Sequence, residues 1–199
     1  EDEFAGLLEI FRSHAIDGLT IHGRTVLERY QTPVHPAHVE MAVREMPCPV
    51  IANGNVVDVE TGLAYLAQTG AAGLMVGRGA IRNPWIFSQL GAALTSSPVS
   101  TAPTHRDLWE YVLELYDEIA RETPKFIPVA HVQRMKKTLA YISHGVDGDF
   151  EYDMRRAKTP EDFQEICRRH LAHDTPLPAK PPVDSKLFCG FEELRIKGS

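Results

Sequence analysis

The sequence of 199 residues lacks any apolar run close to the roughly 18 residues that a membrane-spanning helix needs, and it lacks a secretory leader pattern. The sequence therefore gives no sign of a membrane protein. It has only three cysteines and no Cys-x-x-Cys pair, which excludes a disulfide framework and a cysteine-rich zinc site and favours a reduced, cytoplasmic compartment. Positive charge is also scarce: 21 Lys+Arg against 27 Asp+Glu give a net charge of −6. Bulk electrostatic binding of nucleic acid is thereby excluded, although a local basic face stays open.

What remains is the composition of a globular protein, with 43% hydrophobic and 24% charged residues. The chain begins at Glu1 rather than Met, and a helical pattern starts almost at once. We therefore expect the sequence to be part of a larger protein.

Helical and strand patterns alternate through residues 3–90. Amphipathic helical spacing alternates with short apolar runs, and turn residues separate them. The predicted elements are a helix over 3–14, a strand over 19–22, a helix over 36–46, a strand over 49–52, a helix from the cap Asp58 to Gly70 and a strand over 73–76. Because wholly apolar strands between helices are typical of a parallel sheet, we expect an α/β fold, either doubly wound or a barrel.

The second half of the chain has a different pattern. Residues 91–103 are small, Ser/Thr/Pro-rich and nearly uncharged, which predicts a linker after a first domain at 1–90. Three amphipathic stretches predict a small helical bundle over 104–173: Thr104 caps the first, Pro128 opens the second and Thr159 starts the third. The proline-rich residues 174–199 are predicted to form an extended tail.

Each predicted strand ends in a polar turn that contains glycine, and ligands of parallel α/β folds lie at those strand ends. Asn53-Gly54 and Gly77-Arg78 would supply backbone N–H groups and a guanidinium suited to a phosphate. His22 and Arg24 follow the first strand and could bind a cofactor or a substrate carbonyl. The alternative is that these residues only shape their own turns.

The motifs LTIHGRT, Tyr30, PVIANGN, TGAAGLMVGRGA and NPWIF occur in that order over residues 19–87. This string resembles the C-terminal half of the TIM (β/α)8 barrel of dihydrouridine synthases, the flavin enzymes that reduce uridines in transfer RNA. The later string HVQRMKKTLAYISHG resembles the helical domain that follows that barrel. The resemblance implies a partial barrel followed by a small α-helical domain that binds tRNA.

The resemblance also implies roles for matched residues. Asn53 and Gly54 would bind FMN, Gly77 and Arg78 would hold its phosphate, and His22 with Arg24 would contact the flavin or the uracil. Asn55 completes the second turn, at a position where the family often has Asp, and the loop after HGRT lacks the family's glycine. These two differences affect the shape of that loop.

The implied reaction is NADPH-driven: FMN receives hydride from NADPH and passes it to uracil C6, and a cysteine protonates C5. The family's acid cysteine and FMN-binding lysine lie on earlier strands and have no match here, so no catalytic residue is assigned. Cys48 precedes a strand and would lie at the wrong end of the barrel. We expect this chain to be inactive without the remainder of the barrel.

A basic helix face is predicted in the second half. Residues 125–144 contain four cations and no acid, and the candidates for tRNA contact are Arg134, Lys136, Lys137 and Tyr141, with Arg155, Arg156 and Lys158 as an extension. The alternative is a solvated helix surface. The short spacing of Cys167, His170 and His173 does not make a metal site, because a fourth ligand is missing.

Two other functions stay open from the sequence. One is a different FMN or sugar-phosphate barrel oxidoreductase, since a phosphate site serves many chemistries. The other is a non-catalytic RNA-binding protein.

Overall fold

A computed structural model of the protein describes residues 2–28, 33–98, 102–123 and 125–183, together with Ser185 and Leu187. Contacts divide the chain into two compact units. The first contains the residues up to Ser97 and also Leu187, and the second runs from Pro98 to Ser185. The boundary after Ser97 lies inside the predicted linker. Tyr30 and the predicted tail beyond Leu187 lie outside the described residues.

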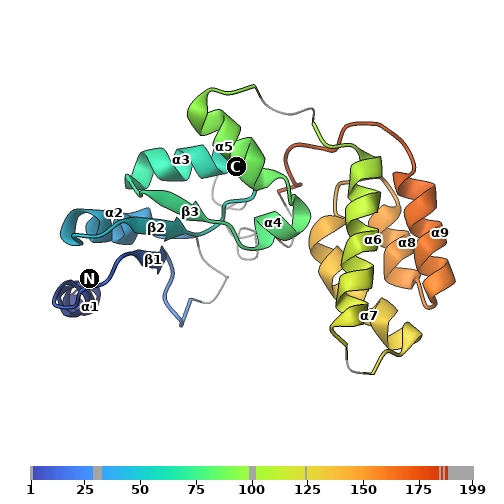
Figure 1. The fold of residues 1–199 in the computed structure, drawn as a ribbon, viewed down its shortest axis with the longest axis horizontal. Coiled ribbons are helices and arrows are strands. Elements are labelled where there is room, and N and C mark those ends of the chain that lie inside the picture. The colour runs from blue at the N-terminus through green and yellow to red at the C-terminus, as the bar shows by residue number, and fades with distance from the viewer. Residues whose placement is uncertain are drawn as a thin grey trace, which may run out of the picture. The chain divides into compact units, whose positions relative to one another are not determined.

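The first unit alternates helices and strands, as the sequence pattern predicts (Figure 1). Its elements are α1 (Asp2–Arg12), β1 (Leu19–His22), α2 (Pro36–Glu45), β2 (Val50–Asn53), α3 (Val59–Thr69), β3 (Gly73–Met75), α4 (Arg78–Arg82) and α5 (Ile86–Thr95).

The three strands form a parallel sheet in the order β1-β2-β3. The register pairs Ile21 with Ala52 and Ala52 with Leu74, and the next row pairs His22 with Asn53 and Asn53 with Met75. Successive residues of a strand point to opposite faces of the sheet. The row of Ile21 and Ala52 is therefore buried under α2 and α3, while the row of His22 and Asn53 points to the other face.

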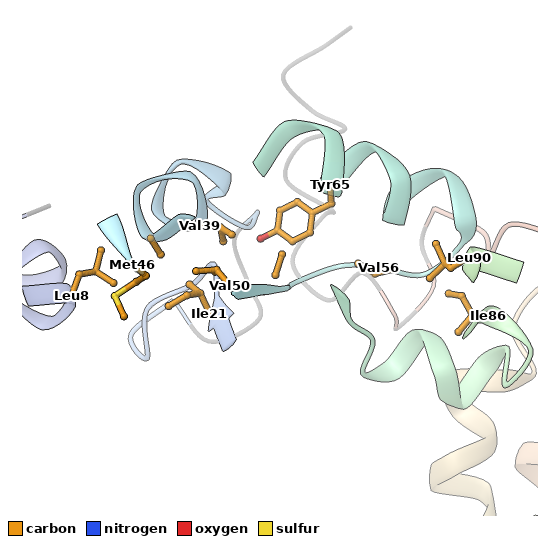
Figure 2. Packing of buried hydrophobic residues seen from close by; sticks show 11 residues of the cluster. Leu8, Ile21, Val39, Met46, Val50, Val56, Tyr65, Ile86 and Leu90 are labelled. Atoms are coloured by element: carbon orange, nitrogen blue, oxygen red, sulfur yellow. The ribbon is translucent and has the colours of Figure 1, made fainter. Parts of the chain in front are cut away.

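The core of the first unit lies between the sheet and its helices (Figure 2). Full burial of an aliphatic side chain contributes about 1.5–3 kcal/mol, so this layer is the main source of stability of the unit. The buried residues labelled in Figure 2 are Leu8, Ile21, Val39, Met46, Val50, Val56, Tyr65, Ile86 and Leu90.

Helix α3 shows how local signals set an element and how packing then selects its buried face. Asp58 accepts a hydrogen bond from the Thr61 N–H at 2.7 Å, which completes a capping box, and Gly70 ends the helix with a φ of 66°. Helical spacing predicts that Leu63 and Leu66 face inward, but the buried positions are Gly62, Tyr65 and Thr69.

The sheet is consistent with part of a TIM barrel. Its strands follow one another in chain order, and α2 and α3 both contact the same face. One βαβαβ half of a doubly wound sheet has the same arrangement. The three strands by themselves do not close a barrel.

The second unit is helical, as predicted, and caps define its helices. Thr104 with Asp107 and Thr159 with Asp162 form capping boxes, each worth about 1 kcal/mol. Phe150, Phe163 and Leu139 are among its fully buried side chains. The helices are α6 (His105–Arg121), α7 (Pro128–Ile142), α8 (Phe150–Arg156) and α9 (Pro160–Leu171).

Three sequence predictions differ from the structure. The predicted linker begins too early, because residues 91–95 continue α5, whose Ile86 and Leu90 are buried in the core of the first unit. Helix α8 was not predicted, because its seven residues bury only Phe150 and Met154. The helical spacing after Pro128 predicts that Val129 faces inward, but Val129 is 53% exposed, since it lies in the first turn of α7.

The start of the predicted tail is bound to the second unit. The backbone of Leu177 donates to the Pro103 carbonyl at 2.8 Å, and His105 N–H donates to the Thr175 carbonyl at 3.0 Å. Gly145 has a φ of 71°, and a Cβ there would lie 2.3 Å from Pro182. Within the described ranges, no helix is long and apolar enough to cross a bilayer.

The two glycines Gly79 and Gly91 give a matched test of this packing. A Cβ on Gly79 would lie 2.3 Å from the Val56 carbonyl oxygen, whereas Gly91 has nothing within 4 Å. We expect Gly79→Ala to lower the free energy of unfolding by about 1–3 kcal/mol, because backbone must move. Gly91→Ala, in the middle of a helix, should raise it by about 0.5–1 kcal/mol. Urea unfolding of both variants checks the prediction, and equal effects would contradict it.

Candidate functional site

The parallel register brings the first two strand-end turns together. The carbonyl of Asn53 accepts a hydrogen bond from the Gly23 N–H at 3.2 Å and lies 3.2 Å from Nδ1 of His22. Because a carbonyl can only accept, this contact assigns a ring proton to Nδ1. His22 and Asn53 thus present polar groups at one edge of the sheet.

Arg24 and Asn55 join the same two turns through their side chains. The Arg24 guanidinium donates to Oδ1 of Asn55 at 3.1 Å. Asn55 has a φ of 49°, in the left-handed region that asparagine tolerates better than most residues. Its Nδ2 is buried and has no hydrogen-bond partner in the described structure. An amide donor left in this state indicates that an acceptor belongs beside it.

Gly54 is required by its surroundings. Its φ of 154° disfavours an L side chain, and a Cβ there would lie 2.5 Å from Cγ1 of Val34. The chain therefore passes close to the loop that follows β1. That loop is held in turn by Glu28, which accepts from the Thr25 N–H at 2.7 Å and pairs with His35 at 2.5 Å. The bond from His35, followed by those from Thr25, lowers the pKa of Glu28 to about 2.

The third turn packs against the segment after the second. Gly77 is the N-cap of α4, and Gly79 lies under the Val56 backbone. Arg78, between the two glycines, is half-buried. All three predicted turns thus occur at the carboxyl end of the sheet, where the sequence placed them. Cys48 precedes β2 and so lies at the opposite end of that strand from Asn53.

Tyr65 is a residue of this region that the sequence did not single out. It is 6% exposed, and its hydroxyl has no hydrogen-bond partner in the described structure. A Cβ on Gly23 would lie 3.1 Å from this hydroxyl and one on Gly54 3.5 Å, so the hydroxyl adjoins both turns. Figure 2 shows the ring reaching from α3 toward the strands. Burial raises the pKa of Tyr65. An isolated tyrosine in an apolar helix stripe carries no sequence signal for this position.

The donors of the three turns suit an anionic, oxygen-rich ligand. Two guanidinium groups, the Asn55 amide and the glycine backbones are donors, and phosphate accepts hydrogen bonds from all of these. The fit to FMN rests on these donors: the buried Nδ2 of Asn55 has no partner among the described residues, and a Cβ on Gly77 would meet nothing within 4 Å, whereas Gly54 and Gly79 pack against the chain's own Val34 and Val56.

The predicted RNA-binding residues divide between two places in the second unit. Lys137 is exposed, Tyr141 is half-buried, and Arg134 is exposed but donates to Oγ1 of Thr123. These three share one side of α7 at three- and four-residue spacing. Lys136 points elsewhere, and its Nζ donates to the Ala157 carbonyl at 2.9 Å, at the end of α8.

Lys136 lines a groove of about 970 Å³, which we call the α8–α9 groove. Its remaining basic residues come from α8, α9 and the segment between them. The groove also contains carboxylates, and one of them, Asp162, accepts from the backbone N–H groups of Lys158 and Thr159. The lining residues are Gln133, Lys136, Asp153, Arg155, Arg156, Ala157, Lys158, Glu161, Asp162, Glu165, Ile166 and Arg169.

The cations of the α8–α9 groove differ in their partners. Arg155 pairs with Glu151, and Arg169 pairs with Asp153. Lys136, Arg156 and Lys158 form no ion pair with any carboxylate of the described residues, and all three adjoin the end of α8. The Arg156 guanidinium lies 3.4 Å from the centroid of the exposed Tyr152 ring. Unpaired cations beside an aromatic surface are a combination that RNA-binding proteins use.

Comparison with known proteins assigns the family. The sequence model of the family described as "Dihydrouridine synthase (Dus)" matches residues 2–175, which is most of the chain. The chain belongs to the dihydrouridine synthase family. Two similar relatives are probable tRNA-dihydrouridine synthases. That of Rhodobacter capsulatus is 35% identical over 142 residues, and that of Mycobacterium leprae is 31% identical over 134 residues.

The chain covers less than half of these relatives. The aligned residues are 71% of this chain and 43% of the Rhodobacter protein, and 64% of this chain and 33% of the Mycobacterium protein. The dihydrouridine synthase match includes the three strand-end turns and all four helices of the second unit. Family membership therefore confirms the resemblance drawn from the motifs and disfavours an unrelated sugar-phosphate barrel.

The Tyr65 hydroxyl can be tested without any ligand. Since a buried hydroxyl without a partner is unfavourable, Tyr65→Phe should leave the free energy of unfolding of the ligand-free chain unchanged or raise it by up to about 1 kcal/mol. Tyr152→Phe, at an exposed tyrosine, is the control and should change it by less than about 0.5 kcal/mol. Urea unfolding measures both. A clear loss of stability in Tyr65→Phe would mean that the hydroxyl already has a partner.

Proposed function

We propose that this chain is part of an FMN-dependent tRNA-dihydrouridine synthase and that its strand-end turns form part of the FMN site. The observation that carries the proposal is the family match together with the convergence of the three turns at one edge of the sheet. Neither alone would suffice, because glycine-rich turns serve many ligands.

In this proposal the turns after β2 and β3 hold the FMN phosphate. Arg78 provides charge, and the backbones of Gly54 and Gly77 permit close approach. Asn53 and Asn55 orient the ligand from the second turn, and the unsatisfied Nδ2 of Asn55 supports a polar acceptor at that point. His22 and Arg24, from the first turn, face the flavin or the uracil.

The bound FMN would supply the hydride chemistry that reduces the C5–C6 bond of uridine, with NADPH as the source of electrons. The residues described above bind and orient. The Arg24–Asn55 hydrogen bond fixes a positive charge at the rim, and the contact of Nδ1 with the Asn53 carbonyl orients the His22 ring. We propose that the proton donor comes from the part of the relatives that this chain does not cover.

The tRNA partner is proposed to contact the second unit at two places. One is the side of α7 with Arg134, Lys137 and Tyr141. The other is the α8–α9 groove, where Lys136, Arg156 and Lys158 form no ion pair with a described carboxylate, although the charge of Lys158 acts on Asp162. Phosphate contacts supply most of the sequence-independent affinity for nucleic acid, so these cations set binding strength and register. The carboxylates of the groove would limit its affinity for anions.

The phosphate assignment predicts a loss of flavin in Arg78→Ala. A hydrogen bond to a charged group contributes about 1.5–3 kcal/mol, so the FMN dissociation constant of the full-length enzyme should rise about 10- to 150-fold. Flavin absorbance per protein after gel filtration measures the retention. Arg44→Ala, on the exposed side of α2, is the control. Equal flavin content in both variants and the unchanged enzyme would refute the assignment.

The groove assignment predicts that Lys158→Ala changes the salt dependence of tRNA binding. Removing one phosphate contact should weaken tRNA binding and reduce the slope of log K against log salt by about 0.7–0.9. Arg121→Ala, which removes an exposed cation at the end of α6, should change neither quantity. Fluorescence anisotropy with a tRNA transcript at several salt concentrations gives both slopes. A slope that is unchanged in Lys158→Ala would remove this lysine from the interface.

A further inference from the structure

His170 lies between two carboxylates in the second unit. Its Nδ1 is 2.6 Å from Asp147 in the segment before α8, and its Nε2 is 2.9 Å from Asp153 on α8. The imidazole side chain is 10% exposed. Both ring nitrogens of His170, on α9, thus contact carboxylates from two other segments.

This geometry requires a charged ring. A neutral imidazole has one N–H and can donate to only one of the two carboxylates, whereas the imidazolium donates to both. Burial by itself lowers the pKa of His170, but the hydrogen bonds and charges of Asp147 and Asp153 outweigh burial and raise it. The bond from His170 in turn lowers the pKa of Asp147.

Other charged and titratable groups complete the cluster. Arg169 on α9 donates to Asp153 at 3.1 Å, and the Gly148 N–H donates to Asp147 at 2.9 Å. His105 on α6 acts on Asp147 through its charge, and Nε2 of His173 bonds the His170 carbonyl at 3.0 Å. Loss of the His170 proton removes one positive charge from beside Asp147 and Asp153 and so makes the cluster more negative by one charge.

That charge would be felt in the α8–α9 groove, because Asp153 and Arg169 both line it. In the protonated state Asp153 is held by two cationic donors. In the neutral state it keeps Arg169 and loses at least part of its bond to His170. A phosphate in the groove would then meet a less compensated carboxylate.

We propose that His170 is a protonation switch that couples pH to the affinity of the α8–α9 groove for RNA phosphates. The coupling rests on the proposed function, in which this groove meets the tRNA backbone. His170 is a positioning residue in this device, since it acts through Asp153 rather than on the RNA.

The sign of the effect follows from the directions of the two shifts. The contribution of His170 to stability is complete below its unfolded pKa of about 6.5 and is lost as pH rises through its raised folded pKa. The contribution of Asp147 is present above its unfolded pKa and is lost as pH falls through its lowered value. The contacts of His170 with Asp147 and Asp153, which we call the clamp, are therefore intact between the lowered pKa of Asp147 and the raised pKa of His170. RNA affinity should decline as pH rises above the pKa of His170.

The experiment compares tRNA binding by the full chain at about pH 6 and about pH 9, at constant ionic strength, together with an NMR titration of the His170 ring. The unchanged protein should bind about three- to tenfold more weakly at the higher pH, with a midpoint at the raised pKa of His170. In His170→Gln the decline should disappear. His14→Gln, at an exposed histidine of the first unit, is the matched control and should retain it.

Asp147→Asn provides a second variant, because Asp147 does not line the groove. It removes one carboxylate from His170, so the midpoint of the binding curve should move to lower pH. A decline of the same size and midpoint in His170→Gln would overturn the switch and leave the RNA proposal intact. Absence of tRNA binding at every pH would overturn the RNA proposal and the coupling with it, while the NMR titration would still report the clamp.

Discussion

The parallel hydrogen bonding of three short strands is the constraint on which the candidate site depends. It places the Asn53 carbonyl opposite His22 and within reach of the Gly23 N–H, so two turns separated by thirty residues share one backbone acceptor. Since side chains alternate between faces, a slip of one residue would turn His22 and Asn53 toward the helices and bring Ala52 out of the core. The apolar residues under α2 and α3 therefore fix the register and the site together.

Close backbone contacts then join the turns to one another. Gly54, in the turn after β2, contacts Val34 in the loop after β1. Gly79, after β3, contacts Val56, which follows the turn after β2. Such packing leaves little room for side chains and directs backbone groups to the edge of the sheet. Two buried polar groups near Gly54, Asn55 Nδ2 and the Tyr65 hydroxyl, have no hydrogen-bond partner among the described residues.

In the second unit, charged side chains connect helices to one another. Its helices begin at capping boxes, and its core is made by residues such as Phe150, Phe163 and Leu139. The His170 cluster connects α9 to α8 and to the segment before α8, and it lies next to cations that form no ion pair with a described carboxylate. The groove therefore combines the cations Lys136, Arg156 and Lys158 with several carboxylates.

The amino-acid pattern predicted the alternation of helices and strands up to β3, the turn residues and the family. Periodicity and caps are local signals, so Asp58, Gly70, Thr104 and Thr159 marked helix ends correctly. Motifs such as LTIHGRT and PVIANGN carried the resemblance that the family match confirms. The roles of the site residues, by contrast, stay predictions, because they concern a ligand and a reaction rather than the chain.

Tertiary structure alone decided which residues meet. It extended α5 through residues 91–95, whose small side chains had indicated a linker, and it separated Lys136 from Lys137, adjacent in sequence, by directing the first to the end of α8. It also brought Tyr65 to the turns and His170 between two carboxylates. The physical reason is that these contacts join segments distant in the chain, and their partners are fixed only when the cores of the two units are packed.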